Sequence, residues 1–516
     1  MPPKDEILLT LIVEKREPQL ISLLSPFLSY SGDFKILIID NASTEVSIDE
    51  LARQHPQIMV HARPHKIPYA LGINIALEIA LHEGYGSVFI WDFKAHTIFP
   101  ESLQSLSSWS QSSVSHGLAI TFEESFSLYI PIEIARNVGL LCPILGKQSA
   151  ISRYLKRIIS HSYPIGDFPK QRVTNQLPTR YKDGSPLKLL DQFSNLKKSL
   201  RYPIPLMDIQ GVKRAYNRKK FAPVLLLVYN RPLHTKRILN DFWMQPEAPH
   251  TPLYILSDGG EGIDEVRKIC QQMSQQHTNI TLWLQETNQG LAKNVTNGVE
   301  RVLELHDSVI VLEDDLRLSP YFLRWMNDAL ETYQHHPEVT HLHAGTFYTH
   351  PDLSHNHALH FAGSWGWATW RECWQTYWEA DGSKLLRELE AQRELQKRFD
   401  YGGFMRFTQM LRRQTKGENN SWAIRWHASL LLNHRLSINS NPPLVSNDGF
   451  DGSGTHCGAD DRYNTGVYPY PLYALAQVET TIKESEEARN ILLRYYRRSN
   501  NKLAKAWYKL KELLSR

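Results

Sequence analysis

The stretch Ser308-Val309-Ile310-Val311-Leu312-Glu313-Asp314-Asp315 places three consecutive carboxylates directly after a short apolar run. The run is rich in β-branched residues, which predicts a short buried strand. Acidic side chains in a row repel one another, so they are tolerated where water surrounds them or where a divalent cation and a phosphorylated ligand neutralise them. Taken alone, the stretch fits both a solvated turn and a cation site.

Length and composition indicate an ordinary soluble protein of more than one domain. The chain has 516 residues, which is too long for a single hydrophobic core. Its hydrophobic content of 42% and charged content of 22% are typical of globular proteins. The net charge of +4 is small for this length, so we expect no nucleic acid as a partner.

Cysteine usage and the N-terminus bear on location. The 4 cysteines are widely scattered, which argues against a disulfide framework or a zinc ribbon and fits a reducing compartment. The first residues lack the layout of a signal peptide, and no apolar run approaches the ~20 residues of a membrane span. We expect a cytoplasmic protein, with peripheral contact at the inner face of the plasma membrane as an additional hypothesis.

Strand-length apolar runs alternate with helical patterns in two separate parts of the chain. In the first part, strands are expected at 7–13, 35–39, 58–61 and 86–91, with helices at 20–28, 48–54 and 69–81 between them. From Pro223 the pattern restarts, with strands expected at 224–228, 253–256, 280–284 and 308–312. Such alternation predicts an α/β fold with a mostly parallel sheet, and its repetition indicates an internal duplication.

The domain organisation follows from this pattern. We predict two tandem Rossmann-like domains, at 1–165 and 219–470, with a linker at 166–218 that is rich in Pro, Lys, Arg and Gln. Residues 471–516 are expected to form a helical basic tail. Apolar residues near its end, such as Trp507 and Leu510, share one face with lysines around it, so this amphipathic helix either lies in a membrane interface or packs on its own protein.

Polar residues follow the strands of the second domain. Asn230-Arg231, Asp258 and Glu313-Asp314-Asp315 each stand directly after a predicted strand. Parallel α/β sheets bind ligands at the carboxyl ends of their strands. An arginine suits phosphate, an aspartate accepts from a base or ribose, and carboxylates with a divalent cation bind a diphosphate. The agreement of three strand ends favours a nucleotide site over a solvated turn.

Residues 222–460 resemble a GT-A-fold glycosyltransferase, close to the inverting family 2 and its bacterial polysaccharide relatives. Glu-Asp-Asp in place of Asp-x-Asp is also similar to the Golgi N-acetylglucosaminyltransferases. A lone D-x-D triplet occurs by chance in many proteins, whereas an ordered set of segments is specific. The matching segments are Tyr229-Asn230-Arg231-Pro232, Ser257-Asp258-Gly259, Asn288-Gln289-Gly290-Leu291, Leu312-Glu313-Asp314-Asp315, Gly363-Ser364-Trp365-Gly366-Trp367, Ser421-Trp422-Ala423-Ile424-Arg425-Trp426, and the block from Asn447 to His456.

The resemblance implies a Mn²⁺ or Mg²⁺ ion that stabilises the leaving nucleotide. It would be held chiefly by Asp315, with Glu313 and His456 as further ligands, although a histidine in a glycine-rich turn is the plainer interpretation of His456. Trp365, Trp367 and Asp451 are expected near the acceptor or sugar, with core packing as the alternative for the two tryptophans. The donor nucleotide would be bound by Asn230, Arg231, Asp258, Asn288 and Asp314.

An inverting transfer needs a general base to take the proton of the acceptor hydroxyl. The Golgi relatives carry a carboxylate near the tryptophan-containing helix, where this chain has Asn420-Ser421-Trp422-Ala423. Glu418, Asp448 and Asp451 are the nearby candidates, and the sequence does not choose between Glu418 and Asp448.

The first domain also resembles a family 2 GT-A domain, through residues 38–45, but it departs at the decisive positions. Lys94-Ala95-His96 stands where the D-x-D is expected, and Lys66-Ile67-Pro68 replaces Asn-x-Gly. Because a lysine repels a cation, we expect a non-catalytic domain used for docking, acceptor binding or assembly. A metal-independent site with Lys94 on a phosphate is the alternative.

The leading hypothesis is therefore a metal-dependent hexosyl- or N-acetylhexosaminyltransferase. It would move a sugar from a nucleotide-sugar donor to a glycan or polyprenyl-linked oligosaccharide, by inversion in a single displacement. A sugar nucleotidyltransferase is the second hypothesis, although the segment Tyr229-Asn230-Arg231-Pro232 lacks the glycine-rich, basic character of a triphosphate loop. The third is a non-catalytic sugar- or nucleotide-binding scaffold, against which the retained acidic cluster counts.

Overall fold

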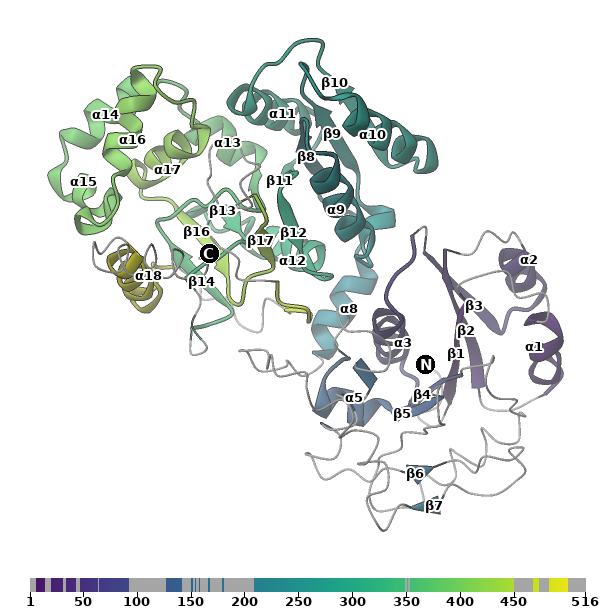
Figure 1. Cartoon of the computed structure of the whole chain (residues 1–516). Coiled ribbons are helices and arrows are strands. Elements are labelled where there is room, and N and C mark those ends of the chain that lie inside the picture. The colour runs from purple at the N-terminus through teal and green to yellow at the C-terminus, as the bar shows by residue number, and fades with distance from the viewer. Residues whose placement is uncertain are drawn as a thin grey trace, which may run out of the picture. The chain divides into compact units, whose positions relative to one another are not determined.

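The structure is a computed structural model in which residues 6–13, 20–30, 34–42, 47–63, 65–91, 127–141, 150–151, 154, 157, 166–167, 179–180, 208–348, 350, 353–449, 467–472 and 482–499 are described. The chain divides into two compact units, Met1–Arg218 and Lys219–Arg516. Each unit is an α/β structure built around a sheet that is rich in parallel pairings (Figure 1).

The sheet of the first unit confirms the strands expected from its apolar runs. It contains β1 (Ile7–Val13), β2 (Phe34–Asn41), β3 (Ile58–Arg63), β4 (Ser87–Ile90) and β5 (Leu128–Pro131) in the order β3-β2-β1-β4-β5. All pairings are parallel except that between β4 and β5. Strand β1, in the middle of the sheet, is apolar apart from Thr10, and every one of its residues is buried, as is typical of a parallel sheet that is covered on both faces.

Helices complete the first unit. Among the described residues they are α1 (Leu20–Leu28), α2 (Ser47–Gln54), α3 (Tyr69–Glu83), α5 (Ile132–Val138) and α8 (Ile209–Asn217). Two short strands, β6 (Gly166–Asp167) and β7 (Thr179–Arg180), pair antiparallel with each other. Asp208 caps α8 by accepting from the Gln210 N–H at 2.9 Å. Helix α8 packs on α3, so the last part of the segment predicted as a linker is helical.

The sheet of the second unit has the order β10-β9-β8-β11-β15-β13-β16-β14. Its first part is parallel and consists of β8 (Val224–Val228), β9 (Leu253–Ser257), β10 (Ile280–Leu284) and β11 (Ser308–Glu313). The remaining strands join by mixed pairings: β13 (Val339–His343), β14 (Asn356–Leu359), β15 (Trp367–Trp370) and β16 (Leu436–Ser440). The order β10-β9-β8-β11-β15 is the same, strand for strand, as the order β3-β2-β1-β4-β5 of the first unit.

Amphipathic helices cover the parallel part of this sheet. They are α9 (Pro232–Trp243), α10 (Asp264–Gln276) and α11 (Leu291–Leu305), which lie beside β8 to β10 in Figure 1. Helix α11 buries Val295, Val299 and Val302 against the sheet, at the spacing of one helical face. Helix α12 (Phe322–Tyr333), which the sequence analysis did not identify, packs on β13 and β15.

A group of helices follows β15: α13 (Arg371–Tyr377), α14 (Gly382–Glu390), α15 (Arg393–Phe399), α16 (Phe407–Thr415) and α17 (Trp422–Leu432). Residues 384–399 do not form one continuous helix, because α14 ends at Glu390 and α15 begins at Arg393. The interruption lets Leu389 and Phe399 pack into one apolar cluster with Leu411, which a continuous helix would not allow.

Two further elements close the second unit. The strands β12 (Leu316–Leu318) and β17 (Val445–Asn447) pair antiparallel, directly after the acidic stretch. Helix α18 (Glu486–Ser499) packs on β14, which places part of the predicted tail against its own protein, while residues 500–516 lie outside the described residues. Within the described chain, no helix is both long enough and apolar enough to cross a bilayer.

Candidate nucleotide and metal site

The carboxyl ends of the parallel strands β8, β9 and β11 lie at one edge of the sheet. The side chain of Arg231, which follows β8, contacts the acidic residues that follow β11. This residue stands at the start of α9, immediately after β8. Its Nη2 bonds to Asp314 Oδ1 and lies 3.3 Å from Asp315 Oδ2. The arginine and the acidic turn, which the sequence only suggested to be neighbours, are therefore in direct contact.

The acidic turn keeps carboxylate oxygens that the described protein does not satisfy. The side chains of Asp314 and Asp315 are 5% and 16% exposed. Asp314 Oδ2 and Asp315 Oδ1 are buried and have no hydrogen-bond partner among the described residues. Since an unpaired buried carboxylate oxygen is costly, these two atoms indicate a place for a cation or a donor group.

Electrostatics in the turn reflect this crowding. Burial, reinforced by the charges of Asp315 and Asp314, raises the pKa of Glu313 to about 8. Burial also raises the pKa of Asp314, against the lowering effect of Arg231. Burial by itself lowers the pKa of Arg231, but the two aspartates outweigh it and the net shift is upward. Positive charge is therefore favourable here.

The β12–β17 pair brings a distant segment onto the turn. The Asp448 N–H donates to the Asp315 carbonyl at 2.8 Å, so the end of β17 is fixed against the acidic residues. At the next residue, Gly449, an added Cβ would lie 2.4 Å from Asp315 Oδ2. A side chain at this position would therefore require the Asp315 carboxylate to move.

A charged network positions Asp448. Its Oδ2 lies 3.6 Å from Arg317 Nη1 and 3.9 Å from Arg237 Nη1. Arg317 itself bonds bidentately to the buried Asp241 of α9, at 2.6 and 3.1 Å, and Asp241 also accepts from the Leu318 N–H. Neither Asp241 nor Arg317 was predicted as a site residue, and Gly449 was named only within the block from Asn447 to His456. Asp241 could have been noticed in the sequence as a charged residue among the apolar residues of α9.

The carboxylate of Asp258 is hydrogen-bonded to the backbone of two turns. Its carboxylate accepts backbone N–H groups from Gly259 (2.9 Å), Gln289 (2.8 Å) and Gly290 (3.0 Å). Three of the roughly four lone-pair positions of a carboxylate are thereby used. Asp258 thus ties the end of β9 to the turn that opens α11, and little of its accepting capacity is left for a ligand.

The first unit contains the same tie. Asn41, at the end of β2, accepts from the Ile67 N–H at 2.6 Å and donates to the Ile67 carbonyl at 2.9 Å. Ile67 precedes α3 as Gln289 precedes α11. Both units therefore have a side chain at a strand end that holds the turn before a helix, an asparagine in the first unit and an aspartate in the second.

The turns around Asp258 bring the remaining predicted donor residues together. A Cβ at Gly259 would lie 2.5 Å from the backbone of Thr287, so the two turns touch. A Cβ at Gly260 would lie 3.4 Å from Asn288 Nδ2, and one at Gly262 would lie 3.8 Å from Asn230 Cβ. Asn230, Asp258 and Asn288 consequently line one side of the same sheet edge.

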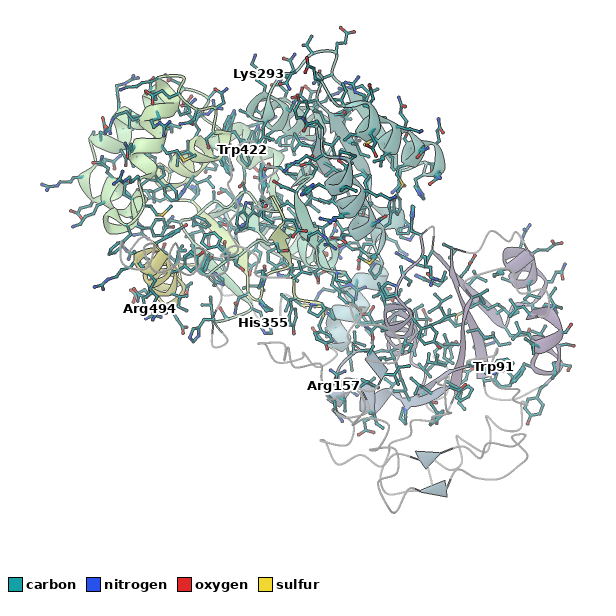
Figure 2. All side chains as sticks on the ribbon, in the orientation of Figure 1. Trp91, Arg157, Lys293, His355, Trp422 and Arg494 are labelled. Atoms are coloured by element: carbon teal, nitrogen blue, oxygen red, sulfur yellow. The ribbon has the colours of Figure 1, made fainter. Side chains whose placement is uncertain are left out.

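Glu418 and Trp367 lie elsewhere. Glu418 is exposed in the turn after α16 and pairs with Arg413 at 3.0 Å. Trp367 is 0% exposed and stacks on Trp422, labelled in Figure 2, with ring centroids 5.0 Å apart. The expectation that Trp367 meets a sugar is wrong, because its ring is enclosed in an aromatic core.

Trp365 remains partly exposed, with its ring 5.8 Å from Phe347. Asp451, His456 and the Lys94-Ala95-His96 segment lie outside the described residues, so their predicted roles are not placed. Across the described residues, no three His, Cys, Asp or Glu side chains are arranged to hold a metal. The two unpaired oxygens of the acidic turn nevertheless match the hard oxygen ligands that Mn²⁺ and Mg²⁺ prefer.

Comparison with known proteins adds a structural context. No family model matches the chain, and neither does a curated protein. Solved structures similar to parts of it include TarS 1–349 of S. aureus, at 16% identity over 24% of this chain and 35% of that chain with a TM-score of 0.21. The same fragment in complex with UDP-GlcNAc gives 18% identity, 24% and 34% coverage and a TM-score of 0.19. The chain thus spans about a third of the TarS fragment.

A third similar structure is the mannosyltransferase PcManGT from Pyrobaculum calidifontis in complex with GDP-Man and Mn²⁺. It matches at 12% identity, over 42% of this chain and 79% of that chain, with a TM-score of 0.23. Each of these similarities covers less than half of this chain.

Proposed function

We propose that the second unit is a GT-A-type glycosyltransferase that moves a hexosyl or N-acetylhexosaminyl group from a nucleotide-sugar donor to a glycan or lipid-linked oligosaccharide. The observation that carries the proposal is the contact of Arg231 with Asp314 and Asp315 at the carboxyl edge of a parallel sheet, beside two buried, unpaired carboxylate oxygens. An arginine next to uncompensated carboxylates suits a ligand that combines phosphate groups with a cation.

Asp315, with Glu313, would hold Mn²⁺ or Mg²⁺. When bound, such a cation neutralises the diphosphate of the donor and makes the nucleotide a better leaving group. Arg231 keeps both aspartates in place and presents a guanidinium to the same space. Asn230 and Asn288 would contact the nucleoside, and Asp258 would act mainly by holding the turn that carries Asn288.

Of the two candidate bases, Asp448 is better supported. Its backbone is bonded to Asp315, and Arg237 and Arg317 fix its carboxylate beside the acidic turn. In this role Asp448 would accept the proton of the acceptor hydroxyl as that oxygen attacks the anomeric carbon, which gives inversion in a single displacement. Glu418 is instead paired with Arg413 on the surface.

The first unit is proposed to be non-catalytic and to serve docking, acceptor binding or assembly. In place of the Asn-x-Gly turn it has Lys66-Ile67-Pro68, tied down by Asn41. The basic tail is proposed to make peripheral membrane contact. Deleting residues 500–516 should then weaken binding to vesicles of anionic lipid, and unchanged binding would remove the tail from this role.

A donor screen tests the proposed function. The full chain is heated with UDP-, GDP-, dTDP- and CMP-sugars, each with and without Mn²⁺. Ligand that binds the folded state raises the melting temperature, by an amount set by its concentration relative to Kd. We expect one nucleotide class to raise it in the presence of Mn²⁺. A response to nucleoside triphosphates with sugar 1-phosphates, and to no nucleotide sugar, would favour the nucleotidyltransferase. Donor binding without turnover on any glycan or lipid-linked acceptor would favour the scaffold.

A further inference from the structure

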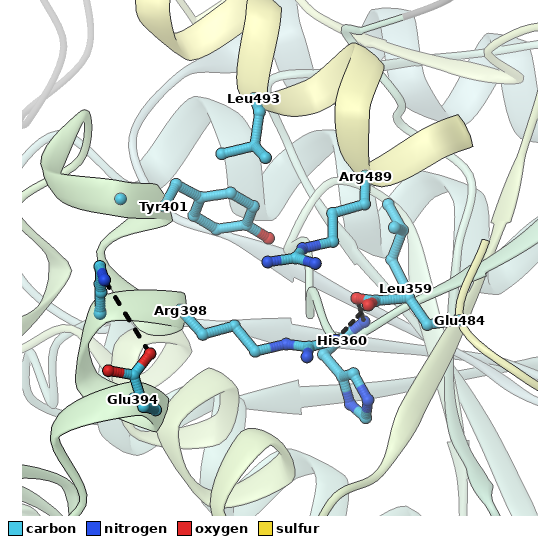
Figure 3. A pocket seen from close by; sticks show the side chains of 10 residues that line it. Leu359, His360, Glu394, Arg398, Tyr401, Glu484, Arg489 and Leu493 are labelled. Carbon is cyan, nitrogen blue, oxygen red and sulfur yellow. Dashed lines mark hydrogen bonds and ion pairs between the residues drawn. The ribbon is translucent and has the colours of Figure 1, made fainter. Parts of the chain in front are cut away.

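A cavity of about 340 Å³ lies in the second unit and shares no lining residue with the acidic site. It is enclosed by the end of β14, by α15, by the short helix η2 (Tyr401–Gly403) and by α18 (Figure 3). Its size is at the lower end of the range of small-molecule pockets, about 300 to 1,000 Å³. It is therefore large enough for a ligand of monosaccharide size.

The charged groups of this cavity leave one cation in excess. Arg398 is ion-paired with Glu484, which also accepts from the His360 N–H at 3.2 Å. The exposed Lys397 lies 4.0 Å from Glu394. Across the described residues, the guanidinium of Arg489 has neither an ion-pair nor a hydrogen-bond partner, and Figure 3 shows it pointing from α18 into the space next to Tyr401.

Three apolar groups also line the cavity, around the guanidinium of Arg489. They are Leu359, Leu493 and the ring of Tyr401. Tyr401 has a φ of 48°, a left-handed conformation that costs a non-glycine residue roughly 1 to 2 kcal/mol. Its ring packs edge-on against Tyr496, with centroids 5.0 Å apart. This contact fixes the ring as one face of the cavity.

We propose that this cavity is a second binding site, for a monosaccharide that carries one phosphate or carboxylate group. The guanidinium of Arg489 would bind the anionic group in the bidentate manner that its planar fork favours. The apolar groups of Tyr401 and Leu493 would accept the C–H face of the sugar ring. This inference does not rest on the proposed transferase activity, because it requires neither donor nucleotide nor metal.

Calorimetric titration of the full chain, without nucleotide or metal, tests the site. The probes are glucose 6-phosphate and glucuronate, with glucose and inorganic phosphate as partial ligands. We expect one of the two anionic sugars to bind and both partial ligands to bind at least tenfold more weakly. Arg489→Gln should weaken binding at least tenfold. Arg494→Gln is the matched control, because Arg494 is an exposed arginine of the same helix (Figure 2), and it should bind as the wild type does.

Other outcomes overturn the inference. Absence of binding by both anionic sugars at millimolar concentration would do so, as would equal affinity in Arg489→Gln. Inorganic phosphate binding as tightly as glucose 6-phosphate would show a simple anion site without sugar recognition. Binding that is lost in Asp315→Asn but kept in Arg489→Gln would belong to the acidic site. If Arg489→Gln does not fold, Leu493→Trp, which fills the cavity from a partly buried position, must abolish binding instead.

Discussion

At the scale of single residues, Arg231 decides whether the acidic turn is stable without ligand. It is the positive partner of both Asp314 and Asp315, and the side chain of Asp314 is almost wholly buried. Removing one member of a buried ion pair leaves the other uncompensated, which costs about 3 kcal/mol or more.

We therefore expect Arg231→Gln to lower the free energy of unfolding by ~3 kcal/mol in the absence of metal. Mn²⁺ should raise the melting temperature of this variant more than that of the wild type, because the cation replaces the lost charge. Thermal denaturation with and without Mn²⁺ measures both effects. Arg413→Gln, which breaks the exposed pair with Glu418, is the control and should change little. An unaltered Arg231→Gln would show that the turn does not depend on this cation.

Asp448 is the residue whose proposed role is chemical. Asp448→Asn should lower kcat by about a hundredfold or more, the usual contribution of a general base, while donor affinity stays within a fewfold of the wild type. Steady-state kinetics and a donor titration separate the two quantities. Glu418→Gln should retain nearly full turnover. The reverse pattern, with turnover lost only in Glu418→Gln, would transfer the role to Glu418.

At the scale of elements, the β12–β17 pair holds the site together, and Asp241 anchors it to α9. The carboxylate of Asp241 is 3% exposed and serves both Arg317 and the Leu318 N–H. A hydrogen bond to a charged group contributes about 1.5 to 3 kcal/mol to the free energy of unfolding, so the bonds of Asp241 contribute substantially to stability.

Asp241→Asn should therefore lower the free energy of unfolding by roughly 2 kcal/mol and reduce turnover, since Arg317 would no longer be held beside Asp448. Denaturant titration gives the first quantity. Asp307→Asn provides the comparison, because that carboxylate is 70% exposed in its pair with Lys220, and its loss should cost less than ~1 kcal/mol. Equal costs for the two variants would contradict the anchoring role.

Elements differ in how far the sequence could predict them. The strands expected at 7–13 and 224–228 coincide with β1 and β8, because continuous apolar runs in a covered parallel sheet are unambiguous. The three-residue strands β12 and β17 were missed, because their pairing joins segments far apart in the sequence and leaves no local pattern. The contact of Arg231 with the acidic turn could be inferred, because both follow strands of the same parallel sheet. The contact of Arg317 with Asp241 could not be inferred, because no local sequence pattern links β12 to the middle of α9.

At the scale of the whole molecule, buried histidines should make the second unit sensitive to acid. Burial lowers the pKa of His343 and His427 to about 4 and that of His357 to about 3. The pKa of His341 is also lowered by burial. The unfolded chain therefore binds more protons than the folded chain below pH ~6.5, and stability is lost as the pH falls through this value.

For one such histidine the loss between pH 7 and pH 5 is about 2 kcal/mol. Replacing His357 by Asn should remove that share of the pH dependence, whatever it does to stability at pH 7. The measurement is the change in free energy of unfolding between the two pH values, from urea titrations. His335→Gln, at an exposed position, should leave this change as in the wild type. An unchanged slope in His357→Asn would mean that His357 is protonated in the folded state.

The proposed function requires the acidic turn to bind a divalent cation together with a nucleoside diphosphate group. Calorimetric titration of the full chain with UDP and GDP, each with and without Mn²⁺, tests it most directly. We expect one nucleotide to bind at least tenfold more tightly with Mn²⁺. Asp315→Asn should lose this dependence on Mn²⁺, and Asp307→Asn should keep it. Nucleotide binding that is indifferent to Mn²⁺, or a Mn²⁺ dependence that survives in Asp315→Asn, would contradict it.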